Sequence, residues 1–324
     1  LETVWEGKCD GTDAMKSTRH QEKECLHILS STTIAVSLCC AATCTPSGTW
    51  SRKPSLGDPE LDGDGDAEEG LRPTVAVARS VFQGEQPVGD SDQVIVETPI
   101  ALAFNGISYA VMLATPADLD DFIRGFAITE GVVEQAREIY DIDCVVNPTG
   151  IELDAKIASQ AAHRLKERRR SMAGPSGCGL CGLESIDQVM RPLNVLPETR
   201  VPSQTPLDRA ISQFRPAQIL SLQTAGAHAA AWCSWDGDLM AIREDVGRHN
   251  ALDKLLGWHS LNTSEGFVLV SSRASYEMVS RCVVAGVGVL AAMSAPTSMA
   301  IHSAKTANLN LLAFTSSGRH ARYS

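Results

Sequence analysis

The sequence has few aromatic residues and few positive charges. Aromatic side chains make up 5% of its 324 residues, and 28 Lys and Arg residues stand against 39 Asp and Glu residues, for a net charge of −11. A broad nucleic-acid surface needs positive charge for the phosphates and aromatic rings for the bases, so this composition argues against one. A local basic run can still serve a phosphate-bearing ligand or an acidic partner.

The sequence also lacks a long apolar run near its start. The only apolar run within the first 72 residues covers residues 28–44, and Ser and Thr dilute it. It is too short and too polar to span a membrane, and no Ala-x-Ala cleavage site follows it, so it makes a poor signal peptide. We therefore expect no membrane span.

Ten cysteines would suit a secreted, disulfide-bonded chain, but their distribution argues against one. Five lie within the first fifty residues, and Cys144, Cys233 and Cys282 lie inside apolar runs. A cysteine in such a run is usually a small buried hydrophobic residue. A reducing compartment fits this pattern best.

Residues 1–72 differ in composition from the rest and are predicted to be a disordered leader that ends in an acidic linker. Three aspartates at alternate positions of this linker resemble the start of a calcium-binding loop. Ala67, however, occupies the position that needs glycine, and Pro73 the position that needs glutamate. The folded domain is expected over residues 73–324.

The first part of this domain, residues 73–175, is predicted to be rich in hairpins. The predicted strands cover residues 94–104, 107–114, 139–146 and 151–157. Asn105-Gly106, between the first two strands, is a strong short-range hairpin signal. Residues 147–150 join the second pair of strands in the same way.

Two helices are predicted in this hairpin-rich part. Residues 115–118 (TPAD) are expected to begin the first, because they offer a possible cap, a proline at the first helical position and an acid in the first turn. Its buried side would consist of Leu119, Phe122, Ile123 and Phe126. A basic helical stretch is expected from about Ser159.

Strands and helices alternate in the last part, residues 183–324, after a proline-rich connection. Strands are expected at residues 227–235, 239–243, 267–271, 289–293 and 309–314, and helical segments at residues 207–224, 247–256, 275–285 and from Pro296. Alternation with short connections predicts an α/β fold in which helices flank a parallel or mixed sheet. Its ligands should bind at the strand ends.

Residues 176–182 (SGCGLCG) hold two cysteines two residues apart, with glycines around them. Glycine is unfavourable inside a helix or strand, so we predict a mobile loop that presents two thiols. The basic run at residues 166–170 and a helix expected just after the loop would both stabilise a thiolate, the reactive form of cysteine. Cys178 and Cys181 are therefore candidate catalytic residues.

Other interpretations of the cysteine pair remain open. A structural zinc site needs two more ligands, and no second Cys-x-x-Cys or His-x-His pair lies at the usual spacing, so a second subunit would have to supply them. A thioredoxin-like redox pair would normally open a helix and lack the flanking glycines. An exposed thiol used as a carrier or nucleophile fits the loop better than these or an inert loop.

Three polar clusters follow predicted strand ends. The densest places Arg248, His249 and Asn250 in the first turn of a helix, where amides and side-chain donors converge on anions, although a solvated helix face is the simpler explanation. A second cluster surrounds Arg273. The third consists of Phe314, Thr315, Ser316, Ser317, Gly318 and Arg319.

Together these clusters predict a pocket for a polyanionic, phosphate-rich ligand. The sequence has no Walker lysine motif and no Gly-x-Gly-x-x-Gly after a predicted strand, so an ordinary nucleotide-binding fold is not indicated.

Four motifs, in this order, resemble the FdhD/NarQ family of sulfur carrier proteins. They are residues 177–182 (GCGLCG), 244–254 (EDVGRHNALDK), 271–279 (SSRASYEMV) and 295–297 (APT). The resemblance extends from about Val94 to Arg319, and the leader has no counterpart in it.

This resemblance implies a sulfurtransferase that receives sulfur from a cysteine desulfurase as a persulfide. The sulfur would pass to the molybdenum of the bis(molybdopterin guanine dinucleotide) cofactor, which is bound as a substrate, for use by formate dehydrogenase. The family's persulfide cysteine matches Cys178, with Cys181 as the second thiol, and its cofactor-binding segment matches residues 314–319. The resemblance also implies a cytoplasmic homodimer with a fold related to cytidine deaminases and no catalytic metal of its own.

The chain departs from the family pattern at Ser316, where relatives often carry a basic residue; this weakens an expected contact to phosphate. The deaminase-like fold leaves two alternative functions open, a zinc-dependent hydrolase and a zinc-bridged binding module. A Cys-x-x-Cys pair is half of the deaminase signature. The other half is missing, because Gly177 stands where proline is expected and no His-x-Glu lies upstream.

Overall fold

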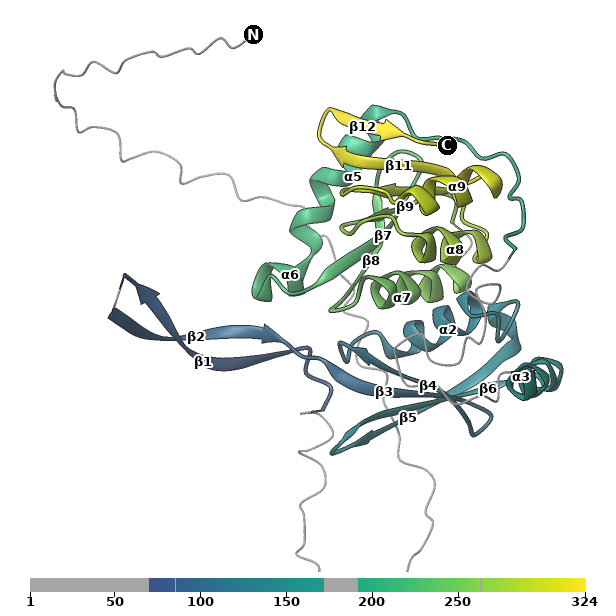
Figure 1. Cartoon of the computed structure of the whole chain (residues 1–324), viewed down its shortest axis with the longest axis horizontal. Helices are drawn as coiled ribbons and strands as arrows, with labels where there is room; N and C mark the ends of the chain where they lie inside the picture. Colours follow the sequence, from purple (N-terminus) through teal and green to yellow (C-terminus); the bar gives the residue numbers. More distant parts are fainter. Residues whose placement is uncertain (1–69, 85, 172–191, 263) are drawn as a thin grey trace, which may run out of the picture. The chain divides into compact units, whose positions relative to one another are not determined.

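The computed structural model describes residues 70–84, 86–171, 192–262 and 264–324. The described strands form three sheets: the two-stranded β1-β2, the four-stranded β4-β3-β6-β5 and the six-stranded β12-β11-β10-β9-β7-β8 (Figure 1). Helices flank the two larger sheets, and both sheets mix parallel and antiparallel neighbours. The predicted α/β class with an N-terminal hairpin-rich part is therefore confirmed.

The described strands are β1 (Thr74–Gln83), β2 (Gln86–Ile95), β3 (Thr98–Phe104), β4 (Ile107–Ala114), β5 (Ile139–Asn147), β6 (Gly150–Ile157), β7 (His228–Cys233), β8 (Leu239–Asp245), β9 (Phe267–Val270), β10 (Val289–Ala292), β11 (Asn310–Ser316) and β12 (Arg319–Arg322). The described helices are α2 (Leu119–Thr129), the short 3-10 helix η1 (Ala136–Glu138), α3 (Ser159–Ser171), α5 (Gln204–Ala217), α6 (Ile219–Thr224), α7 (Arg248–Leu261), α8 (Tyr276–Val284) and α9 (Ser298–Thr306).

Both predicted hairpins are present. Asn105 and Gly106 have φ values of 51° and 74°, so both occupy the left-handed region that a two-residue type I′ turn requires. β3 pairs antiparallel with β4, and β5 with β6. The parallel pairing of β3 with β6 joins the two hairpins into one sheet.

One strand prediction needs correction, and two features were not predicted. The run 94–104 is not one strand, because the chain leaves the ladder after Ile95 and the amide of Val96 donates a 2.8 Å hydrogen bond to the carbonyl of Pro73. Residues 74–95 instead form the β1-β2 ribbon, and β12 extends the larger sheet beyond β11; neither was predicted.

The start of α2 also differs from the prediction. The helix begins at Leu119, and Asp118 before it is left-handed with φ 52°. Thr115 is fully buried, and its amide donates to the Asp245 carboxylate at 2.9 Å. This contact with a residue 130 positions away keeps residues 115–117 out of the helix, which overrides their favourable capping sequence.

The six-stranded sheet is packed on both faces. One face, with Trp232, Val268 and Leu290, packs against α7, α8 and α9, and the other, with Phe267, Leu269 and Val289, packs against α5. Cys233 and Cys282 are fully buried, and burial raises the pKa of Cys233 to about 12 and that of Cys282 further. These two cysteines are buried hydrophobic residues, as predicted, whereas Cys144 is only half-buried.

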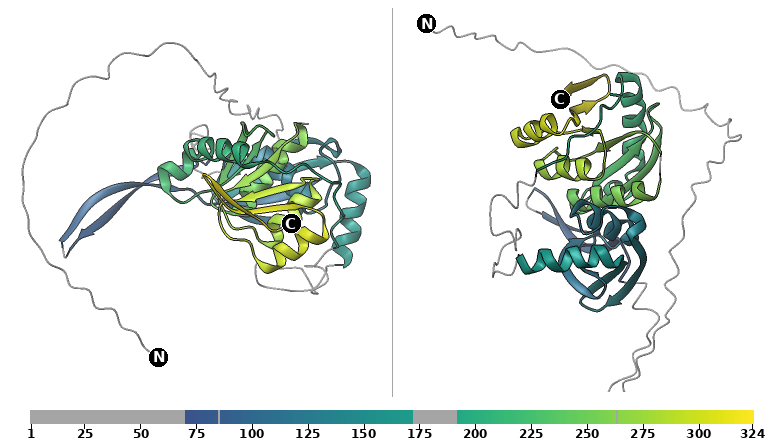
Figure 2. Two further views of the ribbon diagram at one scale, coloured as in Figure 1. Left: turned by 90° about the horizontal axis from the view of Figure 1, so that it is seen from above. Right: turned by 90° about the vertical axis from the view of Figure 1, so that its right-hand side faces the viewer.

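The four-stranded sheet packs against α2 and α3, and the other side of α2 packs against α7 (Figure 2). Two glycines allow this contact. A Cβ atom at Gly125 would lie 1.7 Å from the carbonyl oxygen of Asp253, and one at Gly257 would lie 1.9 Å from that of Asp121. The backbones of α2 and α7 therefore touch, and this fixes the hairpin-rich part against the α/β part.

Candidate functional site

The predicted catalytic cysteines lie outside the described residues. Cys178, Cys181 and the helix expected after them all fall within residues 172–191, between the end of α3 and Pro192. Their assignment therefore stays a prediction from the sequence.

The predicted polar clusters all lie along one edge of the six-stranded sheet. β8, β9, β10 and β11 run in the same direction, so their carboxyl ends share this edge, and α7, α8 and α9 begin there. We call it the carboxyl edge. Because neighbouring strands lie about 4.8 Å apart, the end of β11 is about 19 Å from the end of β8, four strands away. The clusters form a row and not one compact pocket.

At the β8 end of the row, Arg248 and His249 begin α7 and contact Glu277 in the first turn of α8. His249 Nε2 lies 2.7 Å from Glu277 Oε2, and Arg248 Nη2 lies 3.9 Å from the same oxygen. The bond to His249 is the main reason that the pKa of Glu277 is lowered. These three side chains are partly exposed, so this end combines two basic groups with one carboxylate that a ligand can reach.

His228 adjoins this group from the amino end of β7, which reaches the same edge. Burial, and next the positive charge of Arg248, lower its pKa, so the imidazole is neutral at pH 7. Neither His228 nor Glu277 was predicted from the sequence as a site residue. Glu277 lies within one of the recognised motifs, whereas His228 is an isolated residue and only its place in the strand order brings it to the edge.

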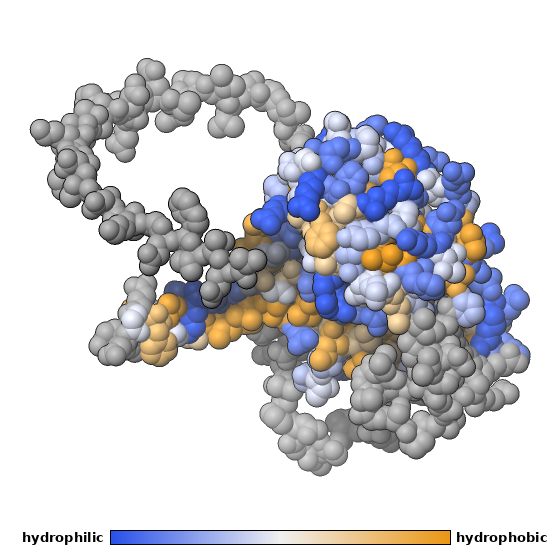
Figure 3. Space-filling view, turned by 45° about the horizontal axis from the view of Figure 1, so that its top comes forward, coloured by the Kyte–Doolittle hydropathy of each residue, from blue (hydrophilic) through white to orange (hydrophobic). Residues whose placement is uncertain are grey.

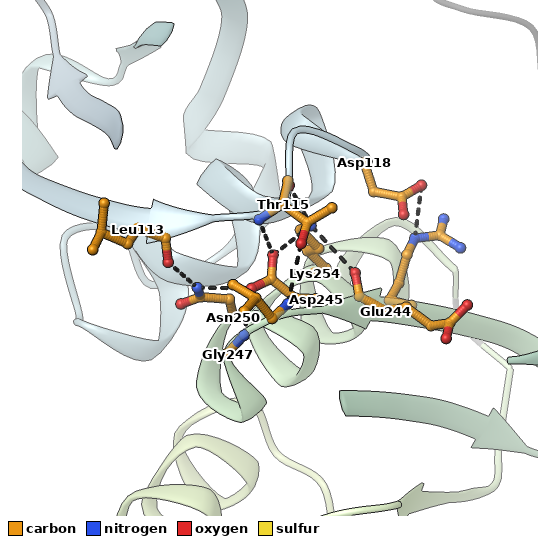
Figure 4. A network of polar contacts seen from close by, with 10 residues as sticks. Leu113, Thr115, Asp118, Glu244, Asp245, Gly247, Asn250 and Lys254 are labelled. Carbon is orange, nitrogen blue, oxygen red and sulfur yellow. Dashed lines mark hydrogen bonds and ion pairs between the residues drawn. The ribbon is translucent and has the colours of Figure 1, made fainter. Parts of the chain in front are cut away.

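Asn250 has a structural role in the described protein (Figure 4). It is buried, and its amide nitrogen donates to the Leu113 carbonyl at 2.9 Å and to Asp245 Oδ1 at 3.0 Å. A ligand could bond to this nitrogen only by replacing one of these hydrogen bonds, so Asn250 is a weaker candidate than Arg248 and His249.

The same network contains a buried ion pair. Lys254 Nζ lies 2.7 Å from Asp245 Oδ2, and both side chains are fully buried. Lys254 also donates to the Thr115 carbonyl at 2.9 Å, and Asp245 accepts from the amides of Thr115 and Gly247. Much of the polar sequence that begins α7 therefore joins this helix to the end of β4, and does not face a ligand (Figure 4).

A second buried group links α7 to α2 and α8. Asp253 Oδ1 accepts a 2.8 Å hydrogen bond from Thr129 and lies 3.4 Å from Arg281, which also contacts Glu130 at 3.3 Å. Asp253 is completely buried, and burial raises the pKa of its carboxyl to about 6 despite the opposing effect of Arg281.

This raised pKa predicts a pH-dependent stability. The ordinary pKa of an aspartate carboxyl is 3.8, so between about pH 4 and 6 the folded protein binds more protons than the unfolded chain. The contribution of protonated Asp253 to the free energy of unfolding is therefore lost as the pH rises through this window. At about 1.4 kcal/mol per pH unit, Asp253→Asn should gain up to about 3 kcal/mol relative to the wild type between pH 4 and 7. Urea unfolding of both proteins over this range measures the difference, and a constant difference would contradict the assignment.

At the β11 end of the row, the predicted cofactor-binding segment forms a turn into β12. Phe314 is left-handed, with φ 51°, and Thr315 is buried. Ser316, Ser317, Gly318 and Arg319 are exposed, and the Gly318 amide donates to Asp208 at 2.7 Å. Arg273, also exposed, follows β9 and lies about midway along the row.

A cavity of about 610 Å³ lies elsewhere, where the β1-β2 ribbon meets the β5-β6 turn. Its lining includes Arg72, Glu97 and Pro148 and none of the predicted site residues. In the described part of the chain, no three His, Cys, Asp or Glu side chains gather in a way that could hold a metal ion. No helix among the described residues has the length and apolar character needed to cross a membrane.

Comparison with known proteins gives the family. The model of the FdhD/NarQ family matches residues 95–324. Two curated relatives are both named sulfur carrier protein FdhD. One, from Cupriavidus necator, is 48% identical over 80% of this chain and 90% of its own length, and one from Variovorax paradoxus is 50% identical over 71% of this chain and 84% of its own.

The fold has a counterpart among solved structures. The crystal structure of a protein from Desulfotalea psychrophila, described as a candidate formate dehydrogenase accessory protein, matches with a TM-score of 0.62. The identity is 23%, over 78% of this chain and 97% of the other. Given the family match and the close relatives, the chain belongs to the FdhD/NarQ family, as the motifs indicated.

Proposed function

We propose that this protein is a sulfurtransferase that carries sulfur as a persulfide on Cys178. The sulfur comes from a cysteine desulfurase and is passed to the molybdenum of bis(molybdopterin guanine dinucleotide), which formate dehydrogenase then uses. The observation that carries the proposal is the family match over residues 95–324, which includes the GCGLCG loop. The names of the relatives support a role in sulfur transfer.

In this proposal the carboxyl edge binds the cofactor substrate. Arg248, His249, Arg273 and Arg319 supply positive charge or hydrogen-bond donors along the row, and the amino ends of α7, α8 and α9 add backbone donors for phosphate. A row about 19 Å long suits a ligand with two guanine dinucleotide arms better than it suits a single mononucleotide.

The direct test is to load the protein with sulfur and locate it. Incubation with a cysteine desulfurase and cysteine should add one sulfur atom to Cys178, and peptide mass spectrometry should find it there. Metal analysis of the purified protein separates this function from the zinc-dependent alternatives. Stoichiometric zinc bound at Cys178 and Cys181, with no persulfide formed, would overturn the proposal.

A substitution at the β11 end tests the binding part of the proposal. Arg319→Ala should weaken binding of the cofactor or of a guanine nucleotide by about 1.5–3 kcal/mol, the range for a hydrogen bond to a charged group. Calorimetry with GDP measures this. Loading of sulfur on Cys178 should not change.

Arg322→Ala is the matched control, because this arginine lies at the far end of the same strand and bonds to Asn310. It should leave GDP affinity within about twofold. If Arg319→Ala reduced sulfur loading while binding was kept, the assignment of the carboxyl edge would be wrong.

The proposal also includes a cytoplasmic location and assembly as a homodimer. These follow from the family resemblance, and the mass of the protein in solution tests the second.

A further inference from the structure

The α/β part of the protein carries charges of both signs, and many of them contact one another. Figure 3 shows hydrophilic residues over much of the surface of this part, whereas apolar residues gather along the β1-β2 ribbon. A charged ligand must therefore replace contacts that the protein's own charges already make. One such contact lies at the β8 end of the carboxyl edge.

This contact joins Glu277 to the two basic residues that begin α7. Glu277 Oε2 lies 2.7 Å from His249 Nε2 and 3.9 Å from Arg248 Nη2. Both basic residues are assigned above to the ligand. Carboxylate and phosphate oxygens are alternative acceptors for the same basic donors, so a carboxylate of the protein itself holds the place of a ligand phosphate.

Glu277 satisfies these donors only in part. Its distance to Arg248 is longer than a hydrogen bond. Arg248 Nε is a buried atom without a hydrogen-bond partner in the described part of the chain, and His249 Nε2 has none there besides its contact with Glu277. A buried donor without an acceptor is unfavourable, so a phosphate group, which has more acceptor atoms than a carboxylate, would be the better partner.

The helix ends beside this contact are not capped by side chains. Thr297 caps α9 by accepting from the amide of Ala300 at 3.2 Å, whereas neither Gly247 before α7 nor Ser275 before α8 makes such a bond. Serine at this position normally caps the first turn. The hydroxyl oxygen of Ser275 is instead buried and has no partner among the described residues. The first turns of α7 and α8 therefore keep donors for an anion.

Glu277 can also leave this place without breaking other ion pairs. Its side chain is 47% exposed, and its ion pairs with described residues are the two given above. Exposed pairs of this kind contribute little to stability. Asp208, the carboxylate at the β11 end of the row, differs because it accepts from Gln204 as well as from the Gly318 amide, both at 2.7 Å. Of these two carboxylates, Glu277 is the one that a ligand can displace.

We propose that Glu277 is an internal competitor for the ligand's phosphate. It contacts Arg248 and His249 in the free protein, moves aside when the cofactor substrate binds, and returns when that substrate leaves. The proposal rests on the binding at the carboxyl edge that is part of the proposed function. A carrier must pass its ligand on, and a competitor lowers the affinity and shortens the time for which the ligand stays bound.

Glu277→Gln in the full chain tests the proposal, because glutamine keeps the size of the side chain and removes its charge. Calorimetry should show GDP binding about fivefold tighter than in the wild type, which corresponds to the loss of an exposed ion pair of about 1 kcal/mol. Glu134→Gln is the matched control, since this carboxylate is 73% exposed and pairs with Arg164 in the hairpin-rich part. It should leave the affinity within twofold. Unchanged or weaker binding in Glu277→Gln would overturn the proposal.

Glu277→Asp separates the contact from the charge. Aspartate keeps the negative charge but is one methylene too short to hold the 2.7 Å contact with His249, so GDP should bind at least twofold tighter than to the wild type. Wild-type affinity in this variant, next to tighter binding in Glu277→Gln, would show that only the charge acts and would overturn the competitor. Arg319→Ala and sulfur loading on Cys178, measured in parallel, report on the proposed function and not on Glu277.

Discussion

Lys254→Met is expected to lower the free energy of unfolding by about 3–5 kcal/mol, the range for removing one partner of a buried ion pair. Lys254 is fully buried against the Asp245 carboxylate at 2.7 Å, and its other two donors reach the carbonyls of Thr115 and Glu244. Methionine fills the space but leaves the carboxylate without its counter-charge and both carbonyls without a donor. Urea unfolding at pH 7 measures the loss.

Lys156→Met is the matched control, because Lys156 also pairs with two aspartates but is 43% exposed. Solvent screens such a pair, so this substitution should cost less than about 1 kcal/mol. A similar loss in both variants would show that the buried network does not hold α7 to the end of β4.

The sequence was enough to predict the elements whose signals are local. A two-residue type I′ turn requires positive φ at both positions, which Asn105 and Gly106 adopt readily. The apolar spacing of Phe122 and Phe126 predicts the buried side of α2. Both features depend on residues a few positions apart. The strand and helix alternation after residue 227 predicted the sheet for the same reason.

Features that depend on distant contacts were not predictable. The favourable capping sequence at Thr115 did not start α2, because Asp245 holds its amide in place. The β1-β2 ribbon was missed because its strands mix valines with charged residues on one face and show little apolar alternation. The sequence predicted a dense polar cluster around Arg248, His249 and Asn250, but it does not reveal that Asp245, Asn250 and Lys254 bond to residues 113–115.

The candidate site was predictable as a set of strand ends, and its dimensions were not. Arg248, Arg273 and Arg319 each follow a strand, but only the strand order shows that they are spread along a row. His228 reaches this row from an antiparallel strand whose amino end lies at the same edge. No spacing in the sequence could have paired it with Arg248.

Cys178→Ser should abolish maturation of the client formate dehydrogenase, with residual activity at the level of a strain that lacks the protein. The reason is chemical, since a serine hydroxyl cannot form a persulfide and the proposed transfer has no other carrier atom at that position. GDP binding and thermal stability should match the wild type, because serine is close in size to cysteine and a glycine-rich segment contributes little to a core. Cys181→Ser is expected to lose activity only in part, since a second thiol would relay or protect the sulfur that Cys178 carries. Full activity of Cys178→Ser would contradict the persulfide mechanism. Unfolding of both variants with release of zinc would instead identify the pair as a structural metal site.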